Sequence, residues 1–218
     1  MQLQGFGVLQ VELTDHCNLN CKMCKPHFES WNQIHGIPKG FLDIGLWTEI
    51  CRDFNRDNIK WDHIIFQWLG DPLLHPQVDQ ILSIATEYLQ GQVGYLRMDS
   101  NMILLDQKRM KNIVESSLQS NIPILLVASI DAYSTKVYQE VKGKDYLRTV
   151  LRNIRAFLRY RKQLAAPLNL QVQFVVQKEN AHEAESFLQY WRDLFLCYGG
   201  EQWYDEIMFK RLSVDGGG

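Results

Sequence analysis

The chain has 218 residues, 46% hydrophobic and 22% charged, a composition typical of a soluble globular domain. Its 23 basic and 25 acidic residues give a net charge of −2, which offers no reason to expect nucleic-acid binding. No apolar run approaches the roughly 20 residues that span a bilayer, and the N-terminus lacks the features of a signal peptide. We therefore expect a cytoplasmic protein without a membrane partner, folded as a single domain over residues 1–218.

Six strand-like segments alternate with helix-like segments along the chain. They are residues 8–14, 63–68, 94–98, 124–130, 170–176 and 206–212. Several are short apolar runs, as expected of strands that are covered on both faces. Because alternating strands and helices form parallel sheets through right-handed crossovers, the order predicts an α/β fold. The specific expectation is a partial (β/α)6 TIM-like barrel, open on one side.

The helices between these strands have readable boundaries. Asp43 and Asp106 are predicted N-caps, since a short carboxylate accepts a hydrogen bond from the exposed amides of a first helical turn. Residues 78–89 and 146–164 each carry their apolar side chains on one face. The long loop of residues 26–40, rich in aromatic residues, Gly and Pro, is typical of loops that serve ligands.

Polar residues stand where four of the predicted strands end. They are Cys17, Asp71, Ser100, Asn101, Ser129 and Asp131. Ligands gather at the carboxyl ends of parallel strands, so these residues predict one shared site. Simpler interpretations remain open. Asp71 before Pro72 can merely end a strand, Ser100 and Asn101 can form a turn, and Ser129 and Asp131 can cap the next helix.

Three of the five cysteines form a compact motif. Cys17, Cys21 and Cys24 have the spacing C-x3-C-x2-C. An odd total with local clustering argues against a disulfide framework and for metal or redox use. Three thiolates on one loop can hold three irons of a [4Fe–4S] cluster, which leaves the fourth iron open to a chelating ligand. A zinc site completed by His16 or His27, and three unligated thiols, are the alternatives.

Other residues that attract attention have ordinary structural interpretations. Cys51 and Cys197 lie far apart in helical segments and are expected to be buried packing residues. His63 and His75 are expected to be structural. Trp68, like Trp31 in the long loop, either lines a cavity or packs in the core.

The surroundings of the three cysteines resemble the signature of the radical S-adenosylmethionine (SAM) superfamily, C-x3-C-x-φ-C after the first strand. The φ position, commonly aromatic, is Met23, an apolar side chain that can pack against adenine. Leu69, Gly70 and Asp71, followed by Pro72, resemble the Gly-Gly-Glu-Pro motif that meets the methionine amino group of SAM. Leu69 replaces a glycine there, and Asp71 replaces the glutamate.

Two later segments continue the resemblance in the expected order. Ser100 and Asn101 resemble the Thr-Asn-Gly turn after the third strand, with Met102 at the glycine position. Ser129 and Asp131 resemble the Ser-x-Asp that lies near SAM and substrate in relatives. Gln173 on the fifth strand is a further candidate contact. The resemblance thus implies SAM contacts at Met23, Leu69, Gly70, Asp71, Ser100, Asn101, Ser129, Asp131 and Gln173, and metal ligation by Cys17, Cys21 and Cys24.

The resemblance also implies an activity, an oxidoreductase-type cleavage of SAM at a [4Fe–4S] cluster. A low-potential donor of the flavodoxin or ferredoxin type reduces the cluster, and the resulting 5′-deoxyadenosyl radical abstracts hydrogen from a substrate. The substrate is a peptide or a small molecule such as a sugar, nucleoside or aminoglycoside. A non-catalytic cluster-binding or regulatory protein is the alternative. The core resembles the SPASM or twitch branch without its cysteine-rich C-terminal extension, which predicts either a minimal core or a shortened chain.

Overall fold

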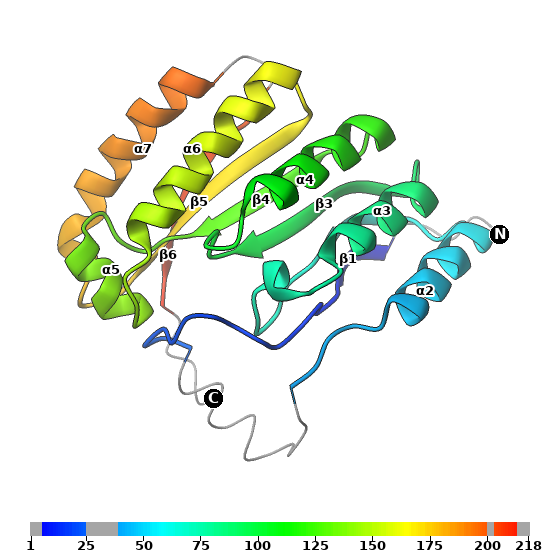
Figure 1. The fold of residues 1–218 in the computed structure, drawn as a ribbon, viewed down its shortest axis with the longest axis horizontal. Helices are drawn as coiled ribbons and strands as arrows, with labels where there is room; N and C mark the ends of the chain where they lie inside the picture. The colour runs from blue at the N-terminus through cyan, green and yellow to red at the C-terminus, as the bar shows by residue number, and fades with distance from the viewer. Residues whose placement is uncertain (1–5, 25–38, 200–202, 213–218) are drawn as a thin grey trace.

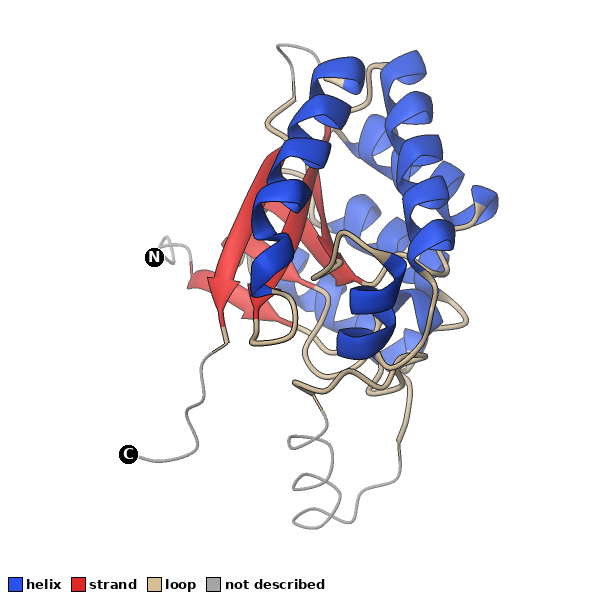
Figure 2. Cartoon of the chain, turned by 90° about the vertical axis from the view of Figure 1, so that its left-hand side faces the viewer, coloured by secondary structure: helices blue, strands red, loops and turns tan. Residues whose placement is uncertain are grey.

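The computed structural model describes residues 6–24, 39–199 and 203–212 (Figure 1). Six parallel strands form one sheet in sequence order: β1 (Phe6–Gln10), β2 (Trp61–Ile65), β3 (Val93–Ser100), β4 (Ile124–Ser129), β5 (Leu168–Val176) and β6 (Glu206–Arg211). The helices cover one face of the curled sheet and leave its concave face open (Figures 1 and 2). This is the predicted partial (β/α)6 barrel.

The α-helices of the described residues follow the strands as predicted. They are α2 (Ile44–Arg56), α3 (Val78–Tyr88), α4 (Gln107–Ser120), α5 (Thr135–Lys142), α6 (Leu147–Leu164) and α7 (Ala184–Tyr198), with the short 3-10 turns η1 (Pro72–Leu74) and η2 (Ala181–Glu183). Both predicted N-caps are confirmed, because Asp43 accepts a hydrogen bond from the Leu46 amide and Asp106 from the Arg109 amide, each at 2.9 Å. No helix in the described part of the chain is both long and apolar enough for a membrane span.

The first two strands are shorter at their carboxyl ends than the sequence predicted. β1 ends at Gln10 instead of residue 14, and β2 ends at Ile65 instead of residue 68. Beyond these points the two segments are joined through a side chain, since the Glu12 carboxylate accepts the Leu69 and Gly70 amides at 2.6 and 3.2 Å. The regular β1–β2 pairing thus ends at the edge of the sheet where the candidate site lies, and the Glu12 side chain bonds the two segments beyond it.

The two faces of the sheet differ in polarity. Side chains that face the helices, such as those of Ile64, Leu96 and Leu126, are fully or almost fully buried in the hydrophobic core. The concave face carries polar side chains in register: Asp99 of β3, Gln171 of β5 and Glu206 of β6 belong to one row, in which β4 contributes Val127. The polar row leaves the concave face suited to a hydrogen-bonding ligand.

Outside the site, the burial expected of Cys197 and the core packing considered for Trp68 are wrong, and Trp31 is not among the described residues. Cys51 is buried as expected, but Cys197 is exposed, because the buried face of α7 is formed by Phe187 and Trp191. Trp68 is 56% exposed, so core packing is wrong for this residue. Trp31 and most of the long loop of residues 26–40 lie outside the described residues.

A buried ion pair attaches the last strand to the rest of the barrel. The Arg161 guanidinium, fully buried on α6, binds both carboxylate oxygens of Asp205 at 2.6 and 2.7 Å. Asp205 also accepts the Leu170 amide at 2.9 Å, and Arg161 stacks 4.4 Å from the Trp203 ring. Asp205 immediately precedes β6, so this pair positions that strand against β5.

Removing the carboxylate should therefore destabilise the fold. We expect Asp205→Ala to lower the free energy of unfolding by about 3–5 kcal/mol, because Arg161 would remain buried without its partner. Urea denaturation measures this change. The exposed Asp193→Ala on α7 is the control, expected to change stability by less than about 0.5 kcal/mol. Equal stabilities for both variants would show that the pair does not hold β6.

Candidate functional site

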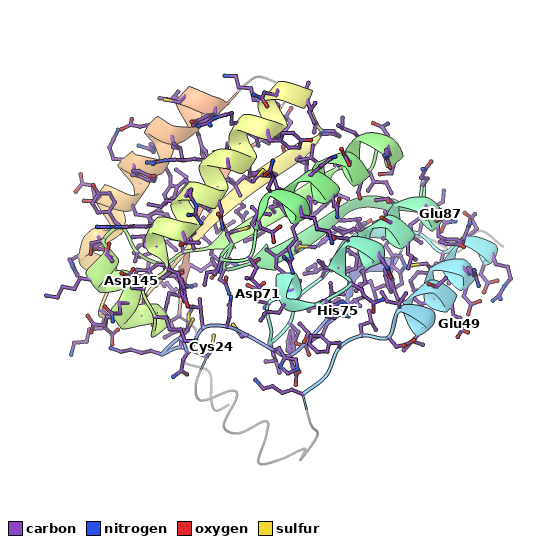
Figure 3. All side chains as sticks on the ribbon, viewed as in Figure 1. Cys24, Glu49, Asp71, His75, Glu87 and Asp145 are labelled. Atoms are coloured by element: carbon purple, nitrogen blue, oxygen red, sulfur yellow. The ribbon has the colours of Figure 1, made fainter. Side chains whose placement is uncertain are left out.

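A cavity of about 230 Å³ opens at the carboxyl ends of the strands. All three motif cysteines line it, together with every predicted SAM contact except Asp131. The predicted convergence of strand ends on one site is therefore found in the structure, and Figure 3 shows Cys24 and Asp71 at this end of the sheet. Four polar lining residues were not singled out by the sequence: Gln67, Asp99, Lys142 and Lys210.

The cysteine loop is fixed on the last turn of α5. The amides of Asn20 and Lys22 donate to the carbonyl oxygens of Lys142 and Val141 at 3.2 and 3.0 Å. These bonds satisfy carbonyls that a helix end leaves without intrahelical partners. Gly143 follows with φ +78°, and a Cβ there would lie 2.5 Å from the Asn20 carbonyl oxygen. The close approach of loop to helix thus requires glycine at this position.

The three thiols share a largely buried environment beside one cation. Burial raises the pKa of the Cys17 thiol. The hydrogen bond with Cys21 lowers the pKa of Cys24 to about 7, and the same bond, together with burial, raises the pKa of Cys21. The nearby Lys142 cation opposes the rise in the pKa of Cys17 and Cys21 and contributes to the lowered pKa of Cys24. Since metal ligands must be thiolates, a cation next to the loop favours the ligating form.

The geometry of the loop bears on the choice between a cluster and zinc. Within residues 6–24, 39–199 and 203–212, no three His, Cys, Asp or Glu side chains are gathered so that they could hold a single metal ion. A zinc ion requires such convergence, because all its ligands lie about 2–2.3 Å from it. His16 stacks on Phe41 with 4.7 Å between ring centroids, and His27 lies outside the described residues. All three thiols line one cavity, with Cys21 hydrogen-bonded to Cys24, and such a set suits a cubane cluster, in which each thiolate binds a different iron.

The segment after β2 packs directly against the backbone of the segment that follows β1. A Cβ on Gly70 would lie 2.0 Å from the Thr14 carbonyl oxygen and 2.7 Å from that of His16. The Asp71 amide donates to the same His16 carbonyl at 2.9 Å. Both obstacles are backbone atoms, so no rotamer change can relieve them. Only glycine fits at this position.

Asp71 uses its carboxylate to join two strand ends. It is 4% exposed and accepts the Leu73 amide, the Ser100 hydroxyl and the Asn101 amide at 3.0, 3.0 and 2.8 Å. Burial raises the pKa of Asp71, while the backbone bonds from Asn101 and Leu73 oppose this rise. Asp71 therefore caps the η1 turn, as the simpler interpretation held, and also lines the cavity.

Ser100 and Asn101 form a turn whose backbone accounts for the glycine that the related motif carries at the position of Met102. Ser100 accepts the Met102 amide at 3.0 Å, and Asn101 accepts the Ile103 amide at 3.0 Å. The Asn101 side-chain amide also donates to Asn18 of the cysteine loop at 2.7 Å. Met102 has φ +62°, the left-handed conformation that glycine adopts freely. Its side chain is fully buried.

Ser129 and Asp131 do not cap the next helix. The N-cap of α5 is Ser134, so the capping interpretation is wrong. Asp131 is fully buried with φ +59°, accepts the Val175 amide at 2.6 Å, and pairs with Lys142 Nζ at 2.5 Å. Lys142 also donates to the Ser129 hydroxyl at 3.2 Å. Burial opposes the charge of Lys142, but Asp131 and the nearby Cys21 together outweigh burial, so the pKa of this lysine is raised.

Lys142 is the main residue of the site that the sequence analysis missed. Its signal was its register, since it shares the buried face of α5 with Val137, Tyr138 and Val141. A lysine at such a position needs a buried partner. Unlike Lys142, whose charge is paired, Gln173 has a buried side-chain oxygen with no hydrogen-bond partner among the described residues. Both side chains line the cavity, where a polar ligand can reach them.

Residues 11–190 match the model of a protein family described as the Radical SAM superfamily. The chain belongs to this superfamily. It is 25% identical over 187 residues to the tungsten-containing aldehyde ferredoxin oxidoreductase cofactor-modifying protein of Pyrococcus furiosus, covering 84% of this chain and 47% of that protein. It is 24% identical over 204 residues to the GTP 3′,8-cyclase of Synechocystis, covering 94% and 53%. The chain thus spans about half the length of these curated relatives.

Solved structures of radical SAM proteins share the fold. SuiB of Streptococcus suis bound to S-adenosylmethionine aligns with a TM-score of 0.64 and 14% identity, covering 97% of this chain and 42% of that one. HydG, a maturase of the [FeFe]-hydrogenase, aligns with a TM-score of 0.56 and 12% identity, covering 94% and 42%. The superfamily uses a [4Fe–4S] cluster and SAM, so the cofactors implied by the cysteine motif agree with the family.

The tight crossing at Gly70 predicts a severe effect of a single methyl group. We expect Gly70→Ala to lower the free energy of unfolding by more than about 3 kcal/mol, because the methyl would overlap two carbonyl oxygens. Gly40→Ala is the matched control, since a Cβ there meets nothing within 4 Å. Thermal unfolding of both variants measures the difference. A Gly70→Ala protein as stable as Gly40→Ala would contradict the close crossing.

Because Lys142 and Asp131 form a buried ion pair, we expect the effects of replacing each of them on the unfolding free energy to be non-additive. We expect Lys142→Met to cost about 3–5 kcal/mol of unfolding free energy, because it leaves Asp131 charged and buried. Adding Asp131→Asn removes that charge, keeps an acceptor for the Val175 amide and suits the left-handed backbone, so it should restore at least about half of the loss. Urea denaturation of the reduced protein measures both, with the exposed Lys144→Met as control. If the losses of unfolding free energy were additive in the double variant, the two side chains would not interact as described.

Proposed function

We propose that this chain is the catalytic core of a radical SAM enzyme. Cys17, Cys21 and Cys24 would hold three irons of a [4Fe–4S] cluster, and the same cavity would bind SAM beside it. When bound, this pair supplies reductive cleavage of SAM and hydrogen abstraction from a substrate. The observation that carries the proposal is the single cavity shared by the three thiols and the predicted SAM contacts.

The chain's own residues would bind and orient SAM. The Ser129 hydroxyl, which accepts a hydrogen bond from Lys142 at 3.2 Å, can donate its proton to the carboxylate of the methionine portion of SAM. The buried oxygen of Gln173 lacks a donor and suits a ribose hydroxyl or the amino group. Met23, held at 3.8 Å by the Gln177 side chain, offers its thioether for packing against adenine. Leu69 and Gly70 add cavity-wall backbone that the Glu12 carboxylate holds in place.

Asp71, Asn101 and Asp131 would act mainly by positioning. The Asp71 carboxylate already holds the ends of β2 and β3 together, and Asn101 is bonded to the cysteine loop. Asp131 holds Lys142 in the cavity wall. Fixed positions of this kind matter because small misplacements of reacting groups cost large factors in rate.

For the substrate we propose a peptide or another polar molecule without a phosphate chain. The concave face offers side-chain amides and hydrogen-bonding pairs, such as Gln171 with Glu206. Its Arg97 is already neutralised by both oxygens of Asp99 at 2.6 Å, and Lys142 is neutralised by Asp131. Of the described lysines and arginines that line the cavity, this leaves Lys210 without an ion pair, whereas a polyphosphate would need several such cations. SuiB, which shares the fold, has been solved bound to its precursor peptide SuiA, with a TM-score of 0.61 and 13% identity.

An anaerobic assay tests the proposal directly. The chain is reconstituted with iron and sulfide, then given dithionite and SAM, and 5′-deoxyadenosine is quantified by mass spectrometry. We expect cluster-dependent formation of 5′-deoxyadenosine. A loaded cluster that never cleaves SAM, even with a flavodoxin donor and candidate peptides, would favour the non-catalytic cluster-binding alternative.

The ligand assignment is tested by exchanging single cysteines. The Cys21→Ala protein should lack the visible absorption of the cluster, because two thiolates cannot stably retain a cubane. Its yield of 5′-deoxyadenosine should fall by at least about 90%. Cys197→Ser is the control, since that thiol is exposed on α7 and lies outside the cavity. Iron and sulfide content are measured in both. A fully loaded cluster in Cys21→Ala would refute the assignment.

A further inference from the structure

Helix α6 carries four arginines along its outer surface. Arg148, Arg152, Arg155 and Arg159 are all exposed and follow one another at spacings of four, three and four residues. This periodicity places them on one face of the helix, over roughly 16 Å at about 1.5 Å per residue. We call these four residues the arginine stripe. The 18 residues of α6 contain no Asp or Glu.

The arginine stripe works against the stability of its own helix. Like charges at spacings of three and four residues repel each other. Arg148 also stands in the first turn, where the helix dipole favours negative charge. Among the described residues, no carboxylate lies within ion-pair distance of any of the four guanidinium groups. Four unneutralised cations in a chain of net charge −2 therefore suggest a partner that supplies the missing negative charge.

Aromatic side chains adjoin the arginine stripe. Arg155 donates to the Tyr190 hydroxyl at 2.8 Å and lies over the Tyr190 ring at 5.8 Å. Tyr190 in turn contacts Tyr133, with 6.2 Å between ring centroids, and Tyr133 is 48% exposed. Tyr146, which directly precedes α6, is 38% exposed. Arginine and tyrosine are the residues enriched in the energetic centres of protein–protein interfaces.

This surface begins beside the cysteine loop. Lys144, four residues before Arg148, donates to the Asn18 carbonyl of that loop at 2.8 Å. Tyr133 follows Asp131, the partner of Lys142 in the cavity wall, by two residues. Figure 3 shows Asp145 and Cys24 at the same end of the molecule, and in Figure 1 α6 runs from this end along the outside of the barrel. A protein seated on the first half of α6 would therefore lie next to the cluster ligands.

We propose that the arginine stripe, with Tyr133 and Tyr146, is the docking surface for an acidic redox protein that reduces the cluster. This inference rests on the proposed function. In the step itself, one electron leaves the reduced flavin of the donor and enters the cluster, so the flavin is oxidised by one electron and no bond is made. Charge complementarity of this kind mainly accelerates association and orients the encounter.

The neighbouring charges favour a protein over a nucleic acid as the partner. Carboxylates stand on both helices beside α6, with Glu115 on α4 and Glu185 and Asp193 on α7. A phosphate backbone is repelled by such carboxylates, whereas a protein surface can present charges of both signs. A hollow of about 380 Å³ between α4 and α6, lined by Lys111, Arg152 and Arg159, can receive protruding acidic side chains.

The test compares two variants that lose the same charge. One replaces the arginine stripe by R148Q, R152Q, R155Q and R159Q. The control replaces four exposed cations elsewhere, R52Q, R56Q, K60Q and K108Q. Both are reconstituted, and stopped-flow absorbance follows cluster reduction by a purified acidic flavodoxin at several salt concentrations. Flavodoxin binding to each protein is measured separately by calorimetry, which does not depend on cluster turnover.

We expect the stripe variant to bind flavodoxin at least about tenfold more weakly at low salt and to lose most of its salt dependence. The control should change by less than about twofold. Reduction by dithionite and the resulting 5′-deoxyadenosine should be unchanged in both variants. If the wild-type protein forms no 5′-deoxyadenosine with dithionite, the proposed function is wrong. The binding measurement then still tests the docking surface, because it does not depend on turnover.

Three results would overturn the docking surface. The first is equal flavodoxin binding by the stripe variant and wild type. The second is an equal loss in both variants, which would reflect net charge alone. The third is salt-sensitive binding of a transfer RNA that depends on the arginine stripe and exceeds flavodoxin binding, since the partner would then be a nucleic acid.

Discussion

The buried ion pair between Lys142 and Asp131 is the interaction on which the site depends. Asp131 reaches from the end of β4 to the Val175 amide of β5, and Lys142 closes the last turn of α5 over it. The carbonyl oxygens of that same turn hold the cysteine loop through Asn20 and Lys22. One pair therefore links two strands, a helix and the three thiols, and places a cation beside all of them.

Acidic side chains at the strand ends hold the cavity together before any ligand arrives. Glu12 fixes the amides of Leu69 and Gly70, and Asp71 joins the ends of β2 and β3. Since each carboxylate accepts hydrogen bonds from protein donors, little reorganisation is needed when a ligand binds. Preorganised polar groups of this kind are what electrostatic catalysis requires.

In the proposed function, the two faces of the barrel wall would serve different partners. The concave face carries neutralised pairs and side-chain amides, which suit a polar substrate close to the cavity. The outer face of α6 carries unneutralised arginines, which suit an acidic protein. The cysteine loop lies between these two faces, bonded to α5 on one side and to Asn101 on the other. Electrons and substrate can thus approach the same loop from different directions.

The fold class, the six strands, both aspartate caps and the cysteine motif could be predicted from the sequence, because periodicity, capping and motif spacing are local properties. The sequence did not determine that β1 ends at Gln10, that Cys197 is exposed, or that Asp131 binds Lys142 instead of capping a helix. These features follow from the folded chain, since each depends on which distant segments contact one another. Lys142 is the clearest case: its register marked it as buried, but only folding supplied the carboxylate that makes a buried ammonium tolerable.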